Sequence, residues 1–165
     1  MDHQLVDKFV AFLESIGIKV SFKPIDAACF LPGLLMENGS IVIDRDKLKY
    51  PGDILHEAGH LATMPPEIRE TMSDNLEDND LNQGGEMMAI AWSYAACHKL
   101  QIDPHIVFHA EGYKGAGENI VQNFNEGYNF GVPLLQWARM TYDERRAPEF
   151  NALPYPNMIR WLRES

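Results

Sequence analysis

The sequence contains little cysteine and no long apolar run. Its two cysteines, Cys29 and Cys97, do not form a CxxC pair, so we expect a cytoplasmic protein without disulfides. A Cys29–Cys97 bridge in an extracellular protein stays open as an alternative. No apolar stretch approaches the ~20 residues that a membrane-spanning helix needs, and the first residues lack the pattern of a secretion signal. We therefore expect neither secretion nor a membrane partner.

Positive charge is scarce as well. The chain has 14 Lys and Arg against 24 Asp and Glu, which gives a formal net charge of −10 at pH 7. Such a surface disfavours binding to nucleic acid or to an anionic membrane. It would suit a basic substrate or a cation, although solubility alone is a simpler explanation of the charge.

Internal repeats and low-complexity linkers are also absent, and 165 residues fit one domain with its own core. Apolar residues at spacings of three and four predict an amphipathic helix over residues 3–16 that ends at Gly17. Alternation over residues 18–23 predicts a strand. Asn38-Gly39 between two apolar runs predicts a β-hairpin, so we expect a small antiparallel sheet of about three strands.

Helices dominate the rest of the chain. Pro51 marks the start of a helix that Met64-Pro65-Pro66 ends. An acidic loop follows, with room for one short helix, and then a long helix from Glu86 to Leu100. Further helices are predicted over residues 103–110, 117–126, 131–145 and 156–163. This order predicts a single α+β domain over residues 1–165, in which the sheet packs on the first two of these helices.

The helix after Pro51 contains His-Glu-Ala-Gly-His at residues 56–60, a match to H-E-x-x-H. Residues i and i+4 share one face of a helix, so the imidazoles of His56 and His60 can bind one Zn²⁺ ion. Glu57 can then act as the general base for a metal-activated water that attacks a carbonyl. A pattern this short also arises by chance, and the same residues would then be ordinary side chains of a half-exposed helix.

A catalytic zinc site needs a third protein ligand. The extended pattern H-E-x-x-H-x-x-G-x-x-H is excluded, because Thr63 and Pro66 stand where its Gly and His are required. Glu86 is the best candidate, since it opens a helix whose alanines allow close packing on the H-E-x-x-H helix. The alternatives are that Glu86 only stabilises its own helix N-terminus, or that an acid between residues 67 and 80 takes its place.

HEAGH followed by Gly-Glu-Met-Met-Ala-Ile-Ala-Trp resembles the gluzincin metallopeptidases. The pattern is most similar to their minimal forms, the minigluzincins, and to the metallopeptidase domain of the ImmA/IrrE group, and it covers roughly residues 35–100 of this chain. The resemblance implies His56, His60 and Glu86 as zinc ligands, Glu57 as general base, and a short antiparallel sheet beside the ligand helix. In one respect the chain departs from larger gluzincins. Ile90 stands where they often carry an acid that orients a ligand histidine.

The leading hypothesis is therefore a zinc-dependent hydrolase, a metallopeptidase that cleaves a peptide or protein substrate. A zinc-binding protein or a regulatory module without proteolytic activity is the alternative.

Other segments could contribute to binding or catalysis. The isoleucine-rich strand ahead of the H-E-x-x-H helix could bind an extended peptide by strand addition. His105 and His109 could form a second metal site, but a surface helix or a contribution to the cleft is favoured. Residues 112–115 could form a lid, but an ordinary connection between helices is favoured. The candidates for stabilising an oxyanion are Tyr94, His98, His105, His109 and Tyr113.

Overall fold

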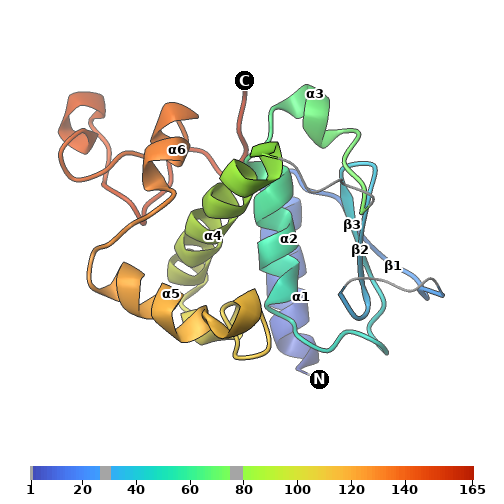
Figure 1. Cartoon of the computed structure of the whole chain (residues 1–165). Helices are drawn as coiled ribbons and strands as arrows, with labels where there is room; N and C mark the ends of the chain where they lie inside the picture. Colours follow the sequence, from blue (N-terminus) through green and yellow to red (C-terminus); the bar gives the residue numbers. More distant parts are fainter. Residues whose placement is uncertain (1, 27–30, 75–79) are drawn as a thin grey trace.

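The computed structural model describes residues 2–26, 31–74 and 80–165, with residues 80–83 described by their backbone alone. Successive layers are formed by a small sheet, by helix α2 (Asp53–Ala62) with α1 (His3–Ile16) behind it, and by α4 (Asp80–Leu100), as Figure 1 shows. The predicted class, α+β with a small three-stranded sheet, is confirmed. In the described part of the chain, no helix is both long and apolar enough to cross a membrane.

Helix α1 follows the sequence signals closely. Asp2 caps it by accepting a hydrogen bond from Leu5 N at 3.0 Å, and the helix ends at Gly17, whose φ of 102° is left-handed. The apolar stripe of α1 is its buried face, which packs against α2 and the sheet. This face consists of Val6, Phe9, Val10, Phe12 and Leu13.

The predicted hairpin is formed by β2 (Leu34–Glu37) and β3 (Ser40–Ile43). Asn38 and Gly39 between them have φ angles of 47° and 76°, and two successive positive φ angles are typical of a type I′ turn. Strand β1 (Val20–Phe22) pairs with the other side of β3. β3 is therefore the central strand of the sheet, and residues 41–43 within it are buried.

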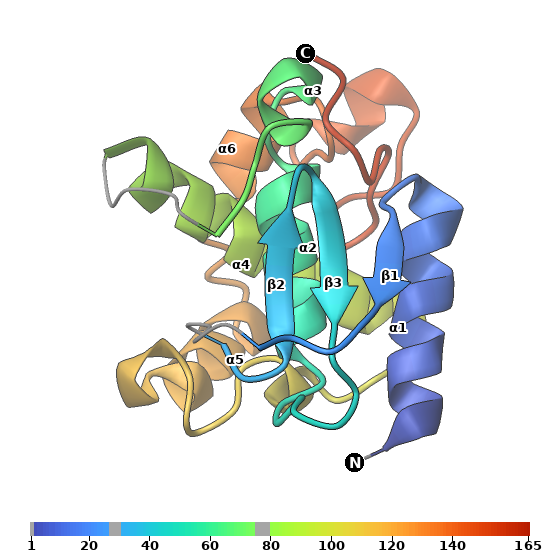
Figure 2. The same cartoon turned by 90° about the vertical axis from the view of Figure 1, so that its right-hand side faces the viewer.

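The prediction of an antiparallel sheet is wrong for one of the two strand pairs, because β1 and β3 are parallel. The chain leaves β1 and enters β2 at the same end of the sheet, as Figure 2 shows, so β2 runs opposite to β1. The hairpin turn then returns β3 in the direction of β1, between the two other strands. Alternation in the sequence locates strands but not their spatial order, and this is why the sequence alone did not predict the mixed sheet.

Helices α2 and α4 pack directly on each other, and α2 also contacts the sheet. Gly59 lies where the two helices meet, and a Cβ at this position would be 2.9 Å from the carbonyl oxygen of Ala89. Small residues thus allow the close approach that the sequence predicts for these helices. The buried face of α2 also contains larger apolar residues, namely Ile54, Leu55 and Leu61.

Shorter elements complete the described helices. The single short helix expected after α2 is α3 (Pro66–Arg69), and α5 (Gly117–Asn125) agrees with the helix predicted over residues 117–126. α4 begins earlier than predicted, at Asp80, so Gly84-Gly85 lies inside the helix rather than before it. Two short 3₁₀ turns are η2 (Tyr113–Gly115) and η3 (Ala147–Phe150).

The C-terminal third contains less helix than the sequence predicts. The helix predicted over residues 103–110 is one 3₁₀ turn, η1 (Pro104–Ile106), and α6 (Val132–Trp137) ends well before residue 145. Residues 156–163 form no helix, because their backbone groups bond to distant parts of the chain. Ile159 N donates to Met140 O at 2.8 Å, and Arg163 N donates to Ala62 O at 2.8 Å. Such long-range bonds cannot be anticipated from local periodicity.

Of the two cysteines, the structure describes only Cys97. Cys97 is fully buried on α4, and burial raises the pKa of its thiol to about 12. Cys29 lies outside the described residues, and so does any pairing between the two. The buried position of Cys97 in the core makes it a packing residue.

Candidate metal centre

His56 and His60 lie one turn apart on α2, and Glu86 reaches them from α4. The Nε2 atoms of the two histidines are 3.2 Å apart. Glu86 Oε1 lies 3.4 Å from His56 Nε2, and Glu86 Oε2 lies 2.9 Å from His60 Nε2. Two atoms that bind one zinc ion tetrahedrally are separated by about 3.3 Å. The structure thus brings together the three side chains predicted as ligands, in an arrangement that could hold a metal ion.

Glu86 is the acid that meets the histidines. Within the described ranges, His56, His60 and Glu86 are the only group of three or more His, Cys, Asp or Glu side chains that lie close enough to share an ion. The described acids of the segment after α2 do not belong to it: Glu67, Glu70 and Asp74. Glu77 and Asp78 lie outside the described residues, as does the side chain of Asp80.

The charge of Glu86 favours binding of a cation between the three side chains. Burial alone would raise the pKa of Glu86, but its hydrogen bonds to His56 and His60 outweigh burial and lower that pKa well below the usual range. Burial opposes protonation of His56, yet the hydrogen bond and charge of Glu86 raise the pKa of His56 overall. The carboxylate is therefore ionised at neutral pH and stabilises positive charge at the point where the three side chains meet.

Comparison with known proteins gives no further guide. No family model, curated protein or solved structure matches this chain. The likeness to gluzincins accordingly stays a resemblance in sequence. Support for a metal centre comes from the arrangement of the side chains themselves.

Glu57, the predicted general base, is half-buried and follows His56 on α2. Burial raises the pKa of its carboxyl, His56 and His60 oppose this, and Asp74 and Glu86 add to it. A carboxylate with a raised pKa is a stronger base than an exposed one. The environment of Glu57 therefore suits proton transfer beside the three candidate ligands.

A segment after α4 contacts one of the candidate ligands. Tyr113 places its hydroxyl 2.7 Å from Nδ1 of His56. Burial, together with the charges of Glu86, Asp53 and Glu57, raises the pKa of Tyr113 far above its usual value, so the phenol stays protonated. Nothing in the sequence marks Tyr113 as a partner of His56, because the contact depends on the path of the loop. Ile90, at the position where larger gluzincins often carry an orienting acid, is buried in the core. Tyr113 rather than a residue of α4 contacts Nδ1 of His56.

The other residues considered as oxyanion donors do not join the group. Tyr94 donates to Asn125 Oδ1 at 3.0 Å, and exposed His98 lies near the C-terminal end of α4. His105 and His109 do not come together as the second metal site that their spacing left open, because residues 103–110 form no continuous helix and each histidine has its own acidic partner. His105 lies between Asp103 and Glu118, at 2.7 and 2.9 Å, and His109 Nε2 lies 2.8 Å from Asp53 Oδ1.

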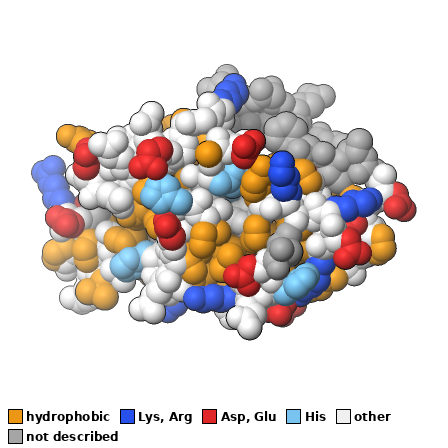
Figure 3. Space-filling model, turned by 90° about the horizontal axis from the view of Figure 1, so that it is seen from below, with side chains coloured by type: hydrophobic (Ala, Val, Ile, Leu, Met, Phe, Trp, Pro, Cys, Tyr) orange, Lys and Arg blue, Asp and Glu red, His pale blue; other side chains and the backbone are white. Residues whose placement is uncertain are grey.

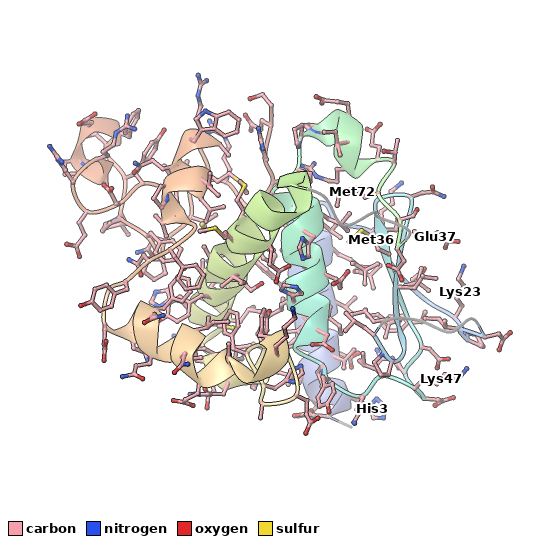
Figure 4. The ribbon with its side chains drawn as sticks, viewed as in Figure 1. His3, Lys23, Met36, Glu37, Lys47 and Met72 are labelled. Atoms are coloured by element: carbon pink, nitrogen blue, oxygen red, sulfur yellow. The ribbon has the colours of Figure 1, made fainter. Side chains whose placement is uncertain are left out.

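Strand addition to the isoleucine-rich strand is excluded, because β3 is paired on both sides. The edge strand on the side of α4 is β2 (Figure 2), and residues 72–74 cover its outer edge. Asp74 N donates to Met36 O at 3.1 Å, and Met36 N donates to Asp74 Oδ1 at 2.7 Å. Gly39 N donates to Met72 O at 2.9 Å, and Figure 4 shows Met72 near Met36. The main-chain groups of Met36 that a bound peptide would need are therefore occupied.

The surface seen in Figure 3 carries charges of both signs. On its visible part, acidic, basic and hydrophobic side chains alternate, with histidines among them. No broad patch of one sign gathers on the described part of this face.

Proposed function

We propose that the chain is a zinc-dependent hydrolase, a metallopeptidase that cleaves a peptide bond. The observation that carries the proposal is the meeting of His56, His60 and Glu86, with Glu57 next to the first histidine. A set of two imidazoles and one carboxylate is typical of catalytic zinc sites, which keep a fourth position for water or substrate. Structural zinc sites, by contrast, usually fill all four positions, most often with cysteine thiolates.

The residues have distinct roles in this proposal. His56, His60 and Glu86 would hold the ion, and Glu86 would supply the negative charge that offsets part of its charge. Bound zinc would polarise the scissile carbonyl and lower the pKa of a coordinated water to about 7. Glu57 accepts a proton from the attacking water and delivers it to the leaving amine, for which its raised pKa is suited.

Residues 72–74, which cover the outer edge of β2, limit how a substrate can bind there. Because residues 72–74 occupy the main-chain groups of Met36, we infer that the substrate binds without adding a strand at that position. A zinc-binding protein or regulatory module without hydrolysis is the alternative function. The cytoplasmic location expected from the cysteine content stays a prediction.

The test is hydrolysis of a mixed peptide library by tag-free protein loaded with zinc, read by mass spectrometry of new N-termini. We expect cleavage by wild type, loss of cleavage after chelation, and recovery on adding zinc. Glu57→Gln should retain zinc and lose cleavage by roughly 100-fold or more, because the general base is removed.

Three results would argue against the proposed zinc-dependent hydrolysis. Cleavage that survives chelation would come from a metal-independent activity. Equal cleavage by wild type and Glu57→Gln would remove Glu57 from the chemistry. A zinc-loaded wild type that cleaves no member of the library would favour the non-proteolytic alternative.

A further inference from the structure

The hydroxyl of Tyr113 meets His56 on a particular side of its ring. It lies 2.7 Å from Nδ1, whereas Nε2 of the same ring faces His60 and Glu86. The two aromatic rings meet edge to face, with centroids 5.1 Å apart. Nδ1 and Nε2 point to different sides of an imidazole, so Tyr113 contacts the ligand histidine without occupying the space between the three candidate ligands.

The segment that carries Tyr113 is attached to the ligand helix at a second point. His109 Nε2 lies 2.8 Å from Asp53 Oδ1, and the His109 ring stacks on Tyr50 at 4.1 Å between centroids. Asp53 and His56 are separated by about one turn of α2. His109 and Tyr113 therefore contact successive turns of the same helix, and the segment between them is held against it.

The backbone at Tyr113 is strained. Tyr113 and Lys114 both have φ of 55°, and Gly115 follows with φ of 82°. Left-handed backbone is uncommon for residues other than glycine. Such conformations persist where the surrounding structure holds them, and they cluster at functional sites. Here the strain falls on the residue whose side chain contacts His56.

We propose that Tyr113 is a positioning residue for His56, a role that rests on the proposed zinc function. A histidine that binds zinc through Nε2 carries its proton on Nδ1. Tyr113 Oη accepts the hydrogen bond from that Nδ1–H, which fixes both the tautomer and the orientation of the ring.

Zinc affinity of tag-free wild type, Tyr113→Phe and Tyr94→Phe, measured by competition with a chelator, tests this role. Tyr113→Phe removes only the hydroxyl and should weaken zinc binding about 10–100-fold. Tyr94→Phe is the matched control, because its hydroxyl bonds to Asn125 instead. The control should bind zinc as wild type does. Zinc binding by Tyr113→Phe equal to that of wild type would overturn the proposal.

Nitrogen NMR of the imidazoles in zinc-loaded wild type gives a second test that needs no variant. We expect His56 to bind through Nε2 and to show an Nδ1–H proton that exchanges slowly with water. A zinc-bound His56 that coordinates through Nδ1, or whose Nδ1–H exchanges freely, would overturn the role of Tyr113 and leave the hydrolase proposal intact. A wild type that binds no zinc would overturn the proposed function itself, and this role with it.

Discussion

Gly59 on α2 packs so tightly against Ala89 on α4 that a Cβ at Gly59 would lie 2.9 Å from the Ala89 carbonyl oxygen and 3.1 Å from its Cα. The atoms in the way belong to the backbone and cannot rotate aside. The contact lies between His56 and His60 on one helix, and close to Glu86 on the other. The separation of α2 and α4 at this point therefore sets how far Glu86 is from the histidines.

Gly59→Ala should destabilise the fold and weaken zinc binding together. Overpacking a well-packed contact costs about 1–3 kcal/mol, and the gain in helix propensity from Gly to Ala, roughly 0.5–1 kcal/mol, offsets only part of it. Urea unfolding and zinc titration of the variant measure the two effects. The matched control is Gly84→Ala on α4, because a Cβ at Gly84 meets nothing within 4 Å. Gly59→Ala behaving like this control would contradict the tight contact.

Asp74 is expected to protect the edge of β2. Replacing it with alanine removes the acceptor for Met36 N and should reduce the free energy of unfolding by about 1 kcal/mol, the usual net value of one hydrogen bond. The Met36 amide should then exchange faster with solvent. The amide of Ile41, which donates to Lys19 O at 3.0 Å in the sheet, serves as an internal reference. Equal acceleration at both amides would indicate general destabilisation rather than an uncovered edge.

Asp44 should make stability depend on acid pH. Its buried carboxylate accepts hydrogen bonds from Ile25 N at 2.9 Å and Asp46 N at 3.1 Å. The first of these bonds is the largest cause of its lowered pKa, while burial works in the opposite direction. A carboxyl group whose pKa is lower in the folded state than in the unfolded state stabilises the fold at pH above its ordinary pKa of 3.8. This stabilisation is lost as the pH falls through the pKa of the folded state.

The measurement is urea unfolding of wild type and Asp44→Asn between neutral pH and acid pH. The variant should be less stable at neutral pH, and the difference should shrink once the pH falls below the ordinary aspartate value of 3.8. A difference in stability that stays constant across this range would show that the charge of Asp44 does not matter.

The sequence was most informative where local signals act. The amphipathic stripe of residues 3–16, the Asn38-Gly39 turn and the proline-bounded helix after Pro51 all predict elements that the structure contains. The meeting of His56 and His60 follows from helical spacing alone. Glu86 could be nominated because its helix is rich in small residues, and the close contact of Gly59 with Ala89 confirms the expected close packing of the two helices.

The features that the sequence did not predict depend on long-range arrangement. The parallel pairing of β1 arises from strand order, and the cover over Met36 arises from the path of residues 72–74. Tyr113 meets His56 across 57 residues of sequence through a loop with left-handed backbone. No periodic pattern encodes such contacts, so the candidate ligands could be nominated from sequence but the partner of His56 could not.

Metal content tests the central claim most directly. Wild type, Glu86→Ala and the control Glu118→Ala, all purified without a histidine tag and incubated with zinc, would be measured by elemental analysis after removal of unbound metal. Glu118 is a suitable control because its carboxylate is exposed and pairs with His105, outside the three-ligand group. We predict about one zinc per chain in wild type and control, and little in Glu86→Ala. Wild type without zinc, or Glu86→Ala with as much zinc as wild type, would contradict the account.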